Sequence, residues 1–147
     1  MSQPDVARID VELTRLIRRV RARAMSELSA IHPNLDYGPF LFLLRICDAP
    51  EGIRGSELAE SLAVHKSTAS RAVAALGRMG LVRRLPDPDD GRAQLLVAEP
   101  EARDRVNAFR TSAHQRIMAT VDGWSDGDVA RFGDLLTRYN DTADEVW

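Results

Sequence analysis

The chain has 147 residues, of which 44% are hydrophobic, so it is long enough to bury a core and short enough to fold as one domain. This length argues against a multidomain enzyme, and a composition of 5% aromatic and 29% charged residues favours a helix-rich fold over a β-sandwich. A formal net charge of −2 argues against a protein that coats nucleic acid or membranes through its total charge. Any contact with nucleic acid must therefore come from a local basic patch.

Cysteine and histidine are too sparse to suggest a disulfide or a metal site. Cys47 is the single cysteine, which excludes an internal disulfide, and His32, His65 and His114 lie far apart in the sequence. No apolar run approaches the ~18 residues of a membrane span, and the first residues lack the pattern of a signal peptide. We therefore expect a cytoplasmic protein with no metal, cofactor or membrane association.

The first third of the chain predicts two helices. Apolar residues recur at steps of three and four from Val6 to about Ile31, which is typical of an amphipathic helix. His-Pro-Asn at 32–34 ends this helix, because the residue before a proline is pushed out of the α region. Residues 37–47 predict a second, more uniformly apolar helix at the centre of the core, and residues 48–52 form a turn by composition.

The middle of the chain predicts a helix-turn-helix followed by two strands. A short helix begins at Ser56 without a full capping box, and a second helix runs from about His65 to Met79 and ends at Gly80. Two short helices a few residues apart are the helix-turn-helix layout. Residues 81–85 and 93–97 read as strands joined by a turn at 86–91, which predicts a two-stranded wing.

The last third predicts two more helices and a dimer. Apolar residues mark a long helix from Val106 to Val121 and a final helix from Val129 to Tyr139, the latter capped by Ser125 with an acid three residues on. Apolar stripes on terminal helices need a partner, and two-fold pairing is the commonest assembly. We expect a homodimer in which residues 1–34 and 100–147 form the dimerisation helices around a lobe of residues 35–99. In the alternative, these helices fold back on their own core.

The most informative stretch of the sequence is residues 61–85. It contains five basic residues and no Asp or Glu, whereas residues 98–147 hold ten acids against six arginines. Charge is therefore segregated along the chain. A basic segment interleaved with Ser and Thr is typical of a surface that reads DNA. Its basic residues are Lys66, Arg71, Arg78, Arg83 and Arg84.

The segment LAVHKSTASRAVAALGRMGLVRRLPDPDDGRA resembles the multiple-antibiotic-resistance regulator (MarR) family of winged helix-turn-helix transcription factors. It carries a Leu-Ala helix, a Lys-Ser-Thr-x-Ser-Arg recognition helix, a Gly-Leu-Val exit and an Asp-Pro-x-Asp-x-Arg wing, and the likeness spans nearly the whole chain. The resemblance implies a mainly α fold with a small two-stranded β wing and terminal dimerisation helices. It also implies a ligand-releasable repressor that binds a pseudo-palindromic site in double-stranded DNA as a homodimer.

The resemblance and the chemistry of the residues together select a set of DNA-contacting candidates. Residues on the first turns of a recognition helix reach base edges or phosphates in the major groove. Ser56 either contacts phosphate or caps its helix, or does both. The candidates are Ser56, His65, Lys66, Ser67, Thr68, Ser70, Arg71, Arg84, Asp90 and Arg92.

The wing is expected to place Arg92 in the narrow minor groove of A·T-rich DNA. In the family pattern Asp90 orients that guanidinium through a charge-assisted hydrogen bond, while the alternative is that Asp90 is only a turn former. Many relatives have a second arginine where Gly91 stands, so this wing should lose one backbone contact and be more flexible. His65 replaces a small capping residue, and residues 98–102 replace the usual Thr-x-x-Gly turn.

The resemblance also implies a small aromatic or phenolic effector that binds between the dimerisation helices and the DNA-binding lobe. Candidate lining residues are His32, Tyr37, Phe40, Leu44 and Arg45, although each also fits plain core or surface. Some relatives use cysteine switches, but Cys47 lies on an apolar helix without a partner cysteine, which favours a buried, inert thiol.

Two other classes of function fit the sequence less well. The sequence has no nucleophile elbow, no phosphate-binding glycine loop and no HExxH motif, so we do not expect an enzyme. The alternative function is a winged-helix protein-interaction module without specific DNA binding. That alternative leaves the acid-free segment and the arginine of the wing without a purpose.

Overall fold

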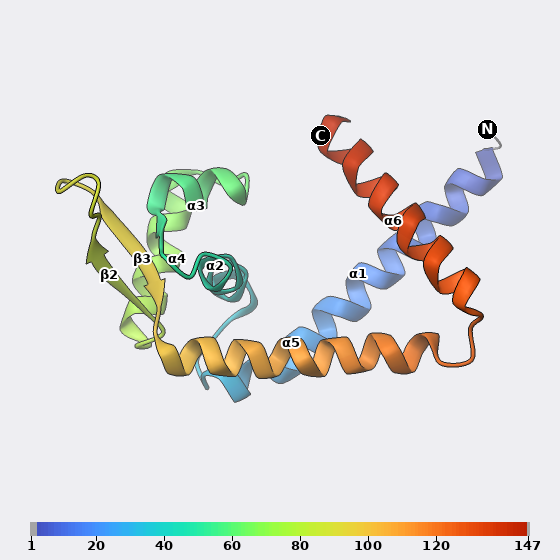
Figure 1. Cartoon of the computed structure of the whole chain (residues 1–147), viewed down its shortest axis with the longest axis horizontal. Coiled ribbons are helices and arrows are strands. Elements are labelled where there is room, and N and C mark those ends of the chain that lie inside the picture. Colours follow the sequence, from blue (N-terminus) through green and yellow to red (C-terminus); the bar gives the residue numbers. More distant parts are fainter. Residues whose placement is uncertain (1–2, 147) are drawn as a thin grey trace. The chain divides into compact units, whose positions relative to one another are not determined.

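The computed structural model describes residues 3–146 and divides them into two compact units, with the division after Phe109. The elements follow one another as six helices and three short strands over the described residues (Figure 1). They are α1 (Gln3–Ile31), α2 (Tyr37–Cys47), β1 (Ile53–Arg54), α3 (Gly55–Ser61), α4 (Lys66–Arg78), β2 (Val82–Pro86), β3 (Gln94–Ala98), α5 (Pro100–Val121) and α6 (Asp126–Val146). No helix among these residues is long and apolar enough to cross a membrane.

The core of the first unit is built around α2, as its uniformly apolar sequence predicts. Phe40, Leu43 and Ile46 of α2 are at most 1% exposed. They belong to one buried cluster with Leu58 of α3, Leu76 of α4, Leu96 of β3 and Val106 of α5. The end of α1 contributes Ala24, Leu28 and Ile31 to this cluster, and the helix stops just before Pro33. The predicted bounds of α2 are confirmed.

The helix-turn-helix consists of α3 and α4, and α4 ends as the sequence predicts. Gly80 has a φ of +69°, and its N–H donates to the Gly77 carbonyl at 3.0 Å. The Leu81 N–H donates to the Leu76 carbonyl at 3.0 Å, which completes a Schellman motif. Glycine suits this position because the left-handed conformation costs a residue with a Cβ atom about 1–2 kcal/mol.

The start of α3 differs from the prediction. The helix begins at Gly55, and Arg54 is its N-cap residue, so Ser56 is the second helical residue and does not cap. The Arg54 backbone N–H donates to the Glu57 carboxylate at 3.1 Å. The Glu57 carboxylate therefore closes the start of the helix on the backbone N–H of its N-cap residue, and the Ser56 side chain takes no part in the cap.

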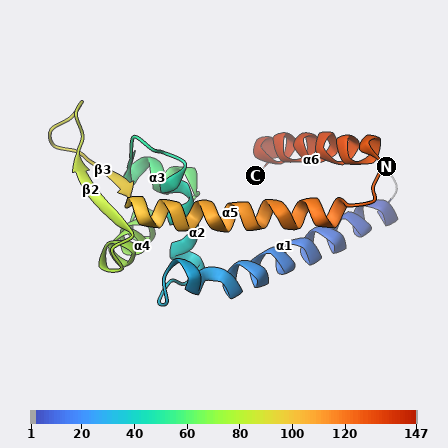
Figure 2. The same ribbon diagram turned by 60° about the horizontal axis from the view of Figure 1, so that its bottom comes forward.

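The sheet has three strands where the sequence predicted two. The strand order is β1-β3-β2, and β1 pairs antiparallel with β3 through Ile53 opposite Leu96 and Arg54 opposite Leu95. A two-residue strand is too short to leave an alternating pattern in the sequence, which is why it was missed. The hairpin of β2 and β3 carries the predicted wing, and its turn projects away from α2, α3 and α4 (Figures 1 and 2).

The last two helices begin with recognisable signals. Pro100 occupies the first position of α5, where its missing N–H and fixed φ are tolerated. The Ser125 hydroxyl accepts the Asp128 N–H at 3.2 Å and donates to the Asp128 carboxylate at 2.7 Å. The predicted cap of α6 by Ser125 is confirmed.

Candidate nucleic-acid interface

The exposed face of α4 carries most of the candidate residues. Ala69, Val73 and Leu76 are buried at helical spacing, and this leaves Ser67, Ser70, Arg71, Ala74 and Arg78 on the outside of the helix. The N-cap residue His65 has an extended backbone and makes no side-chain capping bond, as expected for a histidine in place of a small polar residue. Nine of the ten candidate residues are exposed, and Thr68 is half-buried.

A shallow hollow brings four of the ten candidates together. It has a volume of about 200 Å³ and lies among α3, α4 and β2. Ser56, Lys66, Ser70 and Arg84 supply its polar lining, and Gly55, Ala69, Val73 and Leu96 supply the rest. Two hydroxyl groups and two cations around one hollow provide donors of the kind that bind phosphate oxygens.

The acid-free segment keeps its positive charge in the folded chain. Of its five basic residues, only Arg83 has an acidic partner among the described residues, with Nε 3.7 Å from Oε1 of Glu99. Lys66, Arg71 and Arg84 are exposed and form no salt bridge within that same part of the chain. Unpaired surface cations attract a polyanion and raise its rate of encounter.

The wing turn is organised by carboxylates, but Asp90 acts on a different atom from the one expected. Its carboxylate accepts the backbone N–H of Arg92 at 3.1 Å, rather than a hydrogen bond from the Arg92 guanidinium. An acid two residues before an N–H commonly closes a turn in this way. The expectation that Asp90 orients the guanidinium is thus replaced by a backbone role. The Arg92 side chain is exposed, and no salt bridge of the described residues involves it.

A second carboxylate of the turn makes a contact that the sequence reasoning missed. Asp87 is 6% exposed and is the one buried polar or charged residue among those described. Its Oδ2 accepts a hydrogen bond from Nε of Arg54 at 2.7 Å and forms an ion pair with Nη2 of Arg54 at 2.5 Å, while its Oδ1 accepts the Asp89 N–H at 2.9 Å. Arg54 and Asp87 are 33 residues apart. No local pattern signals their pairing.

These contacts shift the pKa values of both Asp87 and Arg54. The Asp89 N–H and the Arg54 guanidinium hold the pKa of Asp87 below its ordinary value, although burial acts in the opposite direction. The hydrogen bond to Asp87 and its negative charge raise the pKa of Arg54. The pair is therefore ionised at neutral pH.

The candidate effector residues lie on or near α2. Phe40 is 1% exposed and packs edge-to-face on Phe109, with 5.0 Å between ring centroids. Tyr37 is half-buried beneath the guanidinium of Arg21, which lies 5.3 Å from the ring centroid. His32 accepts the Asn34 N–H through Nδ1. Half-buried Leu44 and Arg45 complete the set, and Cys47 is buried, as predicted.

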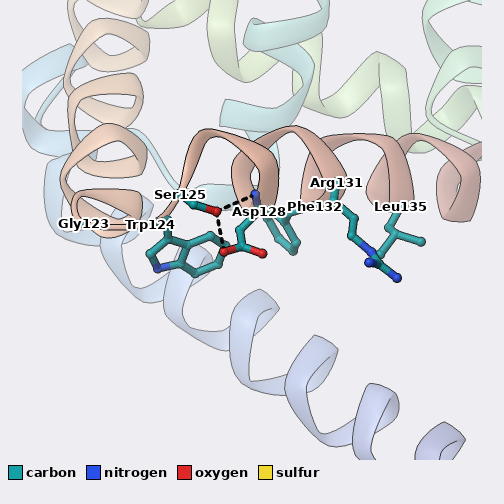
Figure 3. A pocket seen from close by; sticks show the side chains of 7 residues that line it. All are labelled: Gly123, Trp124, Ser125, Asp128, Arg131, Phe132 and Leu135. Atoms are coloured by element: carbon teal, nitrogen blue, oxygen red, sulfur yellow. Dashed lines mark hydrogen bonds between the residues drawn. The ribbon is translucent and has the colours of Figure 1, made fainter.

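A larger hollow of about 490 Å³ lies in the second unit (Figure 3). Trp124, Phe132 and Leu135 are its apolar lining, and the Trp124 and Phe132 rings meet edge-to-face with centroids 5.8 Å apart. Ser125, Asp128 and Arg131 are also at its rim. It contains none of the candidate DNA-contacting or effector residues.

Comparison with known proteins identifies the family. The sequence model of the MarR family matches residues 39–93. The chain is 35% identical over 139 residues to the uncharacterized HTH-type transcriptional regulator YxaD of Bacillus subtilis, and the alignment covers 95% of each protein. It is 26% identical over 129 residues to the uncharacterized HTH-type transcriptional regulator YybA of the same organism. That alignment covers 86% of this chain and 85% of YybA.

Solved structures share the fold. The chain is similar to Streptococcus pneumoniae FabT in complex with DNA, with a TM-score of 0.86 and 20% identity over 97% of this chain and 99% of FabT. It is also similar to the transcriptional regulator SlyA, with a TM-score of 0.76 and 23% identity over 95% and 96% of the two chains. The chain therefore belongs to the MarR family of helix-turn-helix transcriptional regulators, and it is a regulator rather than an enzyme.

Proposed function

We propose that this protein is a cytoplasmic, homodimeric repressor that binds a pseudo-palindromic site in double-stranded DNA and is released by a small aromatic or phenolic effector. The observation that carries DNA binding is the exposed basic surface of the acid-free segment 61–85, which includes α4 and two of the cations around the 200 Å³ hollow. FabT and a MarR-family regulator from Listeria monocytogenes were both crystallised with DNA, which supports the same use of the shared fold here.

The residues of this surface divide into positioning and reading roles. The hollow lined by Ser56, Lys66, Ser70 and Arg84 suits a backbone phosphate, which positions the protein without carrying sequence information. His65, Ser67, Thr68 and Arg71 stand at the start of α4, from which side chains reach base edges in the major groove. Arg92 enters the minor groove beside them, on a turn that Asp90 closes.

The homodimer is supported by apolar side chains that the chain itself leaves exposed. On α6 these are Trp124 at the preceding turn, then Val129, Phe132, Leu135, Leu136 and Tyr139, each at least 38% exposed. On α1 they include Val6, Ile9, Leu16, Ile17 and Val20. A contiguous apolar face of this kind marks a protein interface. Residues 1–34 and 100–147 form that interface in our proposal, and residues 35–99 form the DNA-binding lobe.

Opposite charges on the same two helices favour a second copy as the partner. Helix α1 has six arginines against four acids, whereas α6 has six acids against two arginines. Two copies of the chain can thus bring a net basic helix of one copy and a net acidic helix of the other together. A two-fold dimer would present its two recognition helices about 34 Å apart, one turn of B-DNA.

Release by an effector requires that the effector bind two arrangements of the chain with different affinity. Phe40 fills the core, so a ligand that lodges among Tyr37, Phe40 and Leu44 must displace it. The guanidinium of Arg105 donates to the Ile31 carbonyl at 2.6 Å, which ties α5 to the end of α1. Phe40 of α2 packs on Phe109 of α5, so a shift at α2 would reach α5 and, through this tie, the end of α1. His32 and Arg45 are the candidate polar anchors.

The test is a selection of genomic fragments retained by the purified protein at two salt concentrations, followed by sequencing. The double variant Lys66→Ala/Arg71→Ala is the control. We expect enrichment of a palindrome whose recovery falls as salt rises and disappears in the control. Absence of enrichment at either salt concentration would favour the winged-helix protein-interaction module instead.

A further inference from the structure

Arg54 connects three separate parts of the DNA-binding lobe. Its backbone pairs with Leu95 in the β1–β3 ladder, and its N–H caps α3 through the Glu57 carboxylate. Its guanidinium binds Asp87 at the end of β2, across the sheet from β1. One residue thus joins the sheet edge, the first helix of the helix-turn-helix and the base of the wing turn.

Several contacts fix the Asp87 carboxylate relative to the Arg54 guanidinium. Two guanidinium nitrogens bind the same carboxylate oxygen, and the other oxygen accepts the Asp89 N–H inside the turn. The Asp87 side chain is 4% exposed and the Arg54 side chain 39%, so the carboxylate end of the contact is shielded from water. The Asp87 N–H itself donates to the Ala93 carbonyl on the other side of the turn. The turn that presents Arg92 is therefore fastened at its base.

Arg54 also directly precedes two residues that line the hollow of the candidate interface. Gly55 and Ser56 follow Arg54 directly and line the hollow with Lys66 and Arg84. A change in the position of Arg54 would move the wing and the hollow relative to each other. We propose that the Arg54–Asp87 pair is a positioning device that sets the wing against the recognition helix, so that the minor-groove and major-groove contacts form together. This inference rests on the proposed DNA binding.

A competing role for Arg54 is direct contact with a phosphate, and the two roles predict opposite effects of one substitution. Asp87→Asn removes a negative charge and frees the Arg54 guanidinium. If Arg54 bound phosphate, this variant would bind DNA more tightly and with a steeper salt dependence. If the pair positions the wing, Asp87→Asn weakens binding even though the surface becomes more positive.

The experiment measures the dissociation constant of full-length protein for duplexes that carry the selected palindrome with A-tract or G·C-rich flanks, at two salt concentrations. We expect Asp87→Asn to lose about tenfold on A-tract flanks, the scale of one groove contact, and much less on G·C-rich flanks. Arg92→Ala should give the same pattern, and the double variant should lose no more than either single variant.

Asp89→Asn is the matched control. It also removes one carboxylate charge, but from an exposed side chain two positions along the chain from Asp87. It should leave binding unchanged or slightly tighter. Arg54→Lys keeps the charge but loses the forked contact, and it should reproduce the loss of flank preference. Thermal unfolding of each variant checks that the fold is kept. If Asp87→Asn does not fold, the flank preference of Arg54→Lys tests the positioning role instead.

Tighter binding by Asp87→Asn, or a loss equal on both flanks, would overturn the positioning role. Additive losses in the double variant with Arg92→Ala would do the same. If the unsubstituted protein shows no salt-dependent binding to any selected duplex, it is the proposed function that fails.

Discussion

Gly91 is the residue at which the wing departs most from the family pattern, and its backbone does not require glycine. The described glycines with positive φ are Gly52, Gly80 and Gly123, and a Cβ atom at Gly91 would have no atom within 4 Å apart from those of its immediate chain neighbours. The position beside Arg92 is therefore open to a side chain. A charged residue at position 91 should therefore change the affinity for DNA and not the folding of the wing.

We expect Gly91→Arg to bind the selected palindrome more tightly than the unsubstituted protein. One added phosphate contact in each half-site should steepen the dependence of log affinity on log salt by about 0.9 per half-site. Titration of a labelled duplex over a salt series measures this slope. Gly91→Gln is the control of similar length without charge, and it should leave the slope unchanged. An unchanged slope in Gly91→Arg would mean that the wing tip does not approach the DNA backbone.

The ionised Asp87 also makes a prediction about stability and pH. Its pKa is lowered from the ordinary 3.8 in the folded chain, so its contribution to stability is present above that ordinary value. The contribution is lost as the pH falls through the lowered folded-state pKa. Chemical unfolding of the protein and of Asp87→Asn from neutral pH to about pH 3 measures the difference in their free energies of unfolding. The difference should shrink toward the acid end, and one that grows on acidification would contradict this reading.

At the scale of elements, local signals predict the helices well and the smallest strand not at all. The bounds of α2 and the glycine end of α4 follow from interactions between residues at most five apart in the sequence. β1 exists because Gly52 brings the chain close to β3. A Cβ atom at Gly52 would lie 2.8 Å from Cβ of Leu95. That approach is a property of two segments more than forty residues apart, and no local pattern reports it.

Two glycine substitutions separate backbone strain from close packing. Gly80→Ala should destabilise the protein by about 1–2 kcal/mol, since its φ is +69° and the surrounding space is open. Gly52→Ala adds a steric clash with Leu95 to a φ of +100°, so it should cost more. Denaturant unfolding of both variants measures the two free energies. Equal losses would show that β1 moves away from β3 without penalty.

At the scale of the whole molecule, the proposed homodimer depends on the exposed apolar face of α6. Phe132 is 48% exposed and lines the 490 Å³ hollow beside Trp124 (Figure 3). We expect Phe132→Asp to convert the dimer to monomer, because a charge buried in an apolar interface is costly without a partner. Sedimentation analysis measures the mass. Thr137→Asp adds the same charge at an exposed residue of the same helix outside the apolar set, and it should leave the dimer intact.

If Phe132→Asp remained dimeric, α6 would lie outside the interface. In the monomer that we expect, each recognition helix still folds, but binding to a palindrome loses the advantage of two linked half-sites. Affinity for a single half-site should therefore be kept while affinity for the palindrome falls. Both duplexes can be compared in the same titration.

The sequence by itself determined the mainly helical class, the helix-turn-helix, the wing and the residues that carry charge to its surface. These features rest on periodicity, caps, turns and composition, which are properties of neighbouring residues. Only the tertiary structure decided that a third strand edges the sheet, that Ser56 and Arg84 meet Lys66 around one hollow, and that Arg54 fastens the wing through Asp87. Such contacts join residues far apart in the chain, and their geometry arises only when the core has packed.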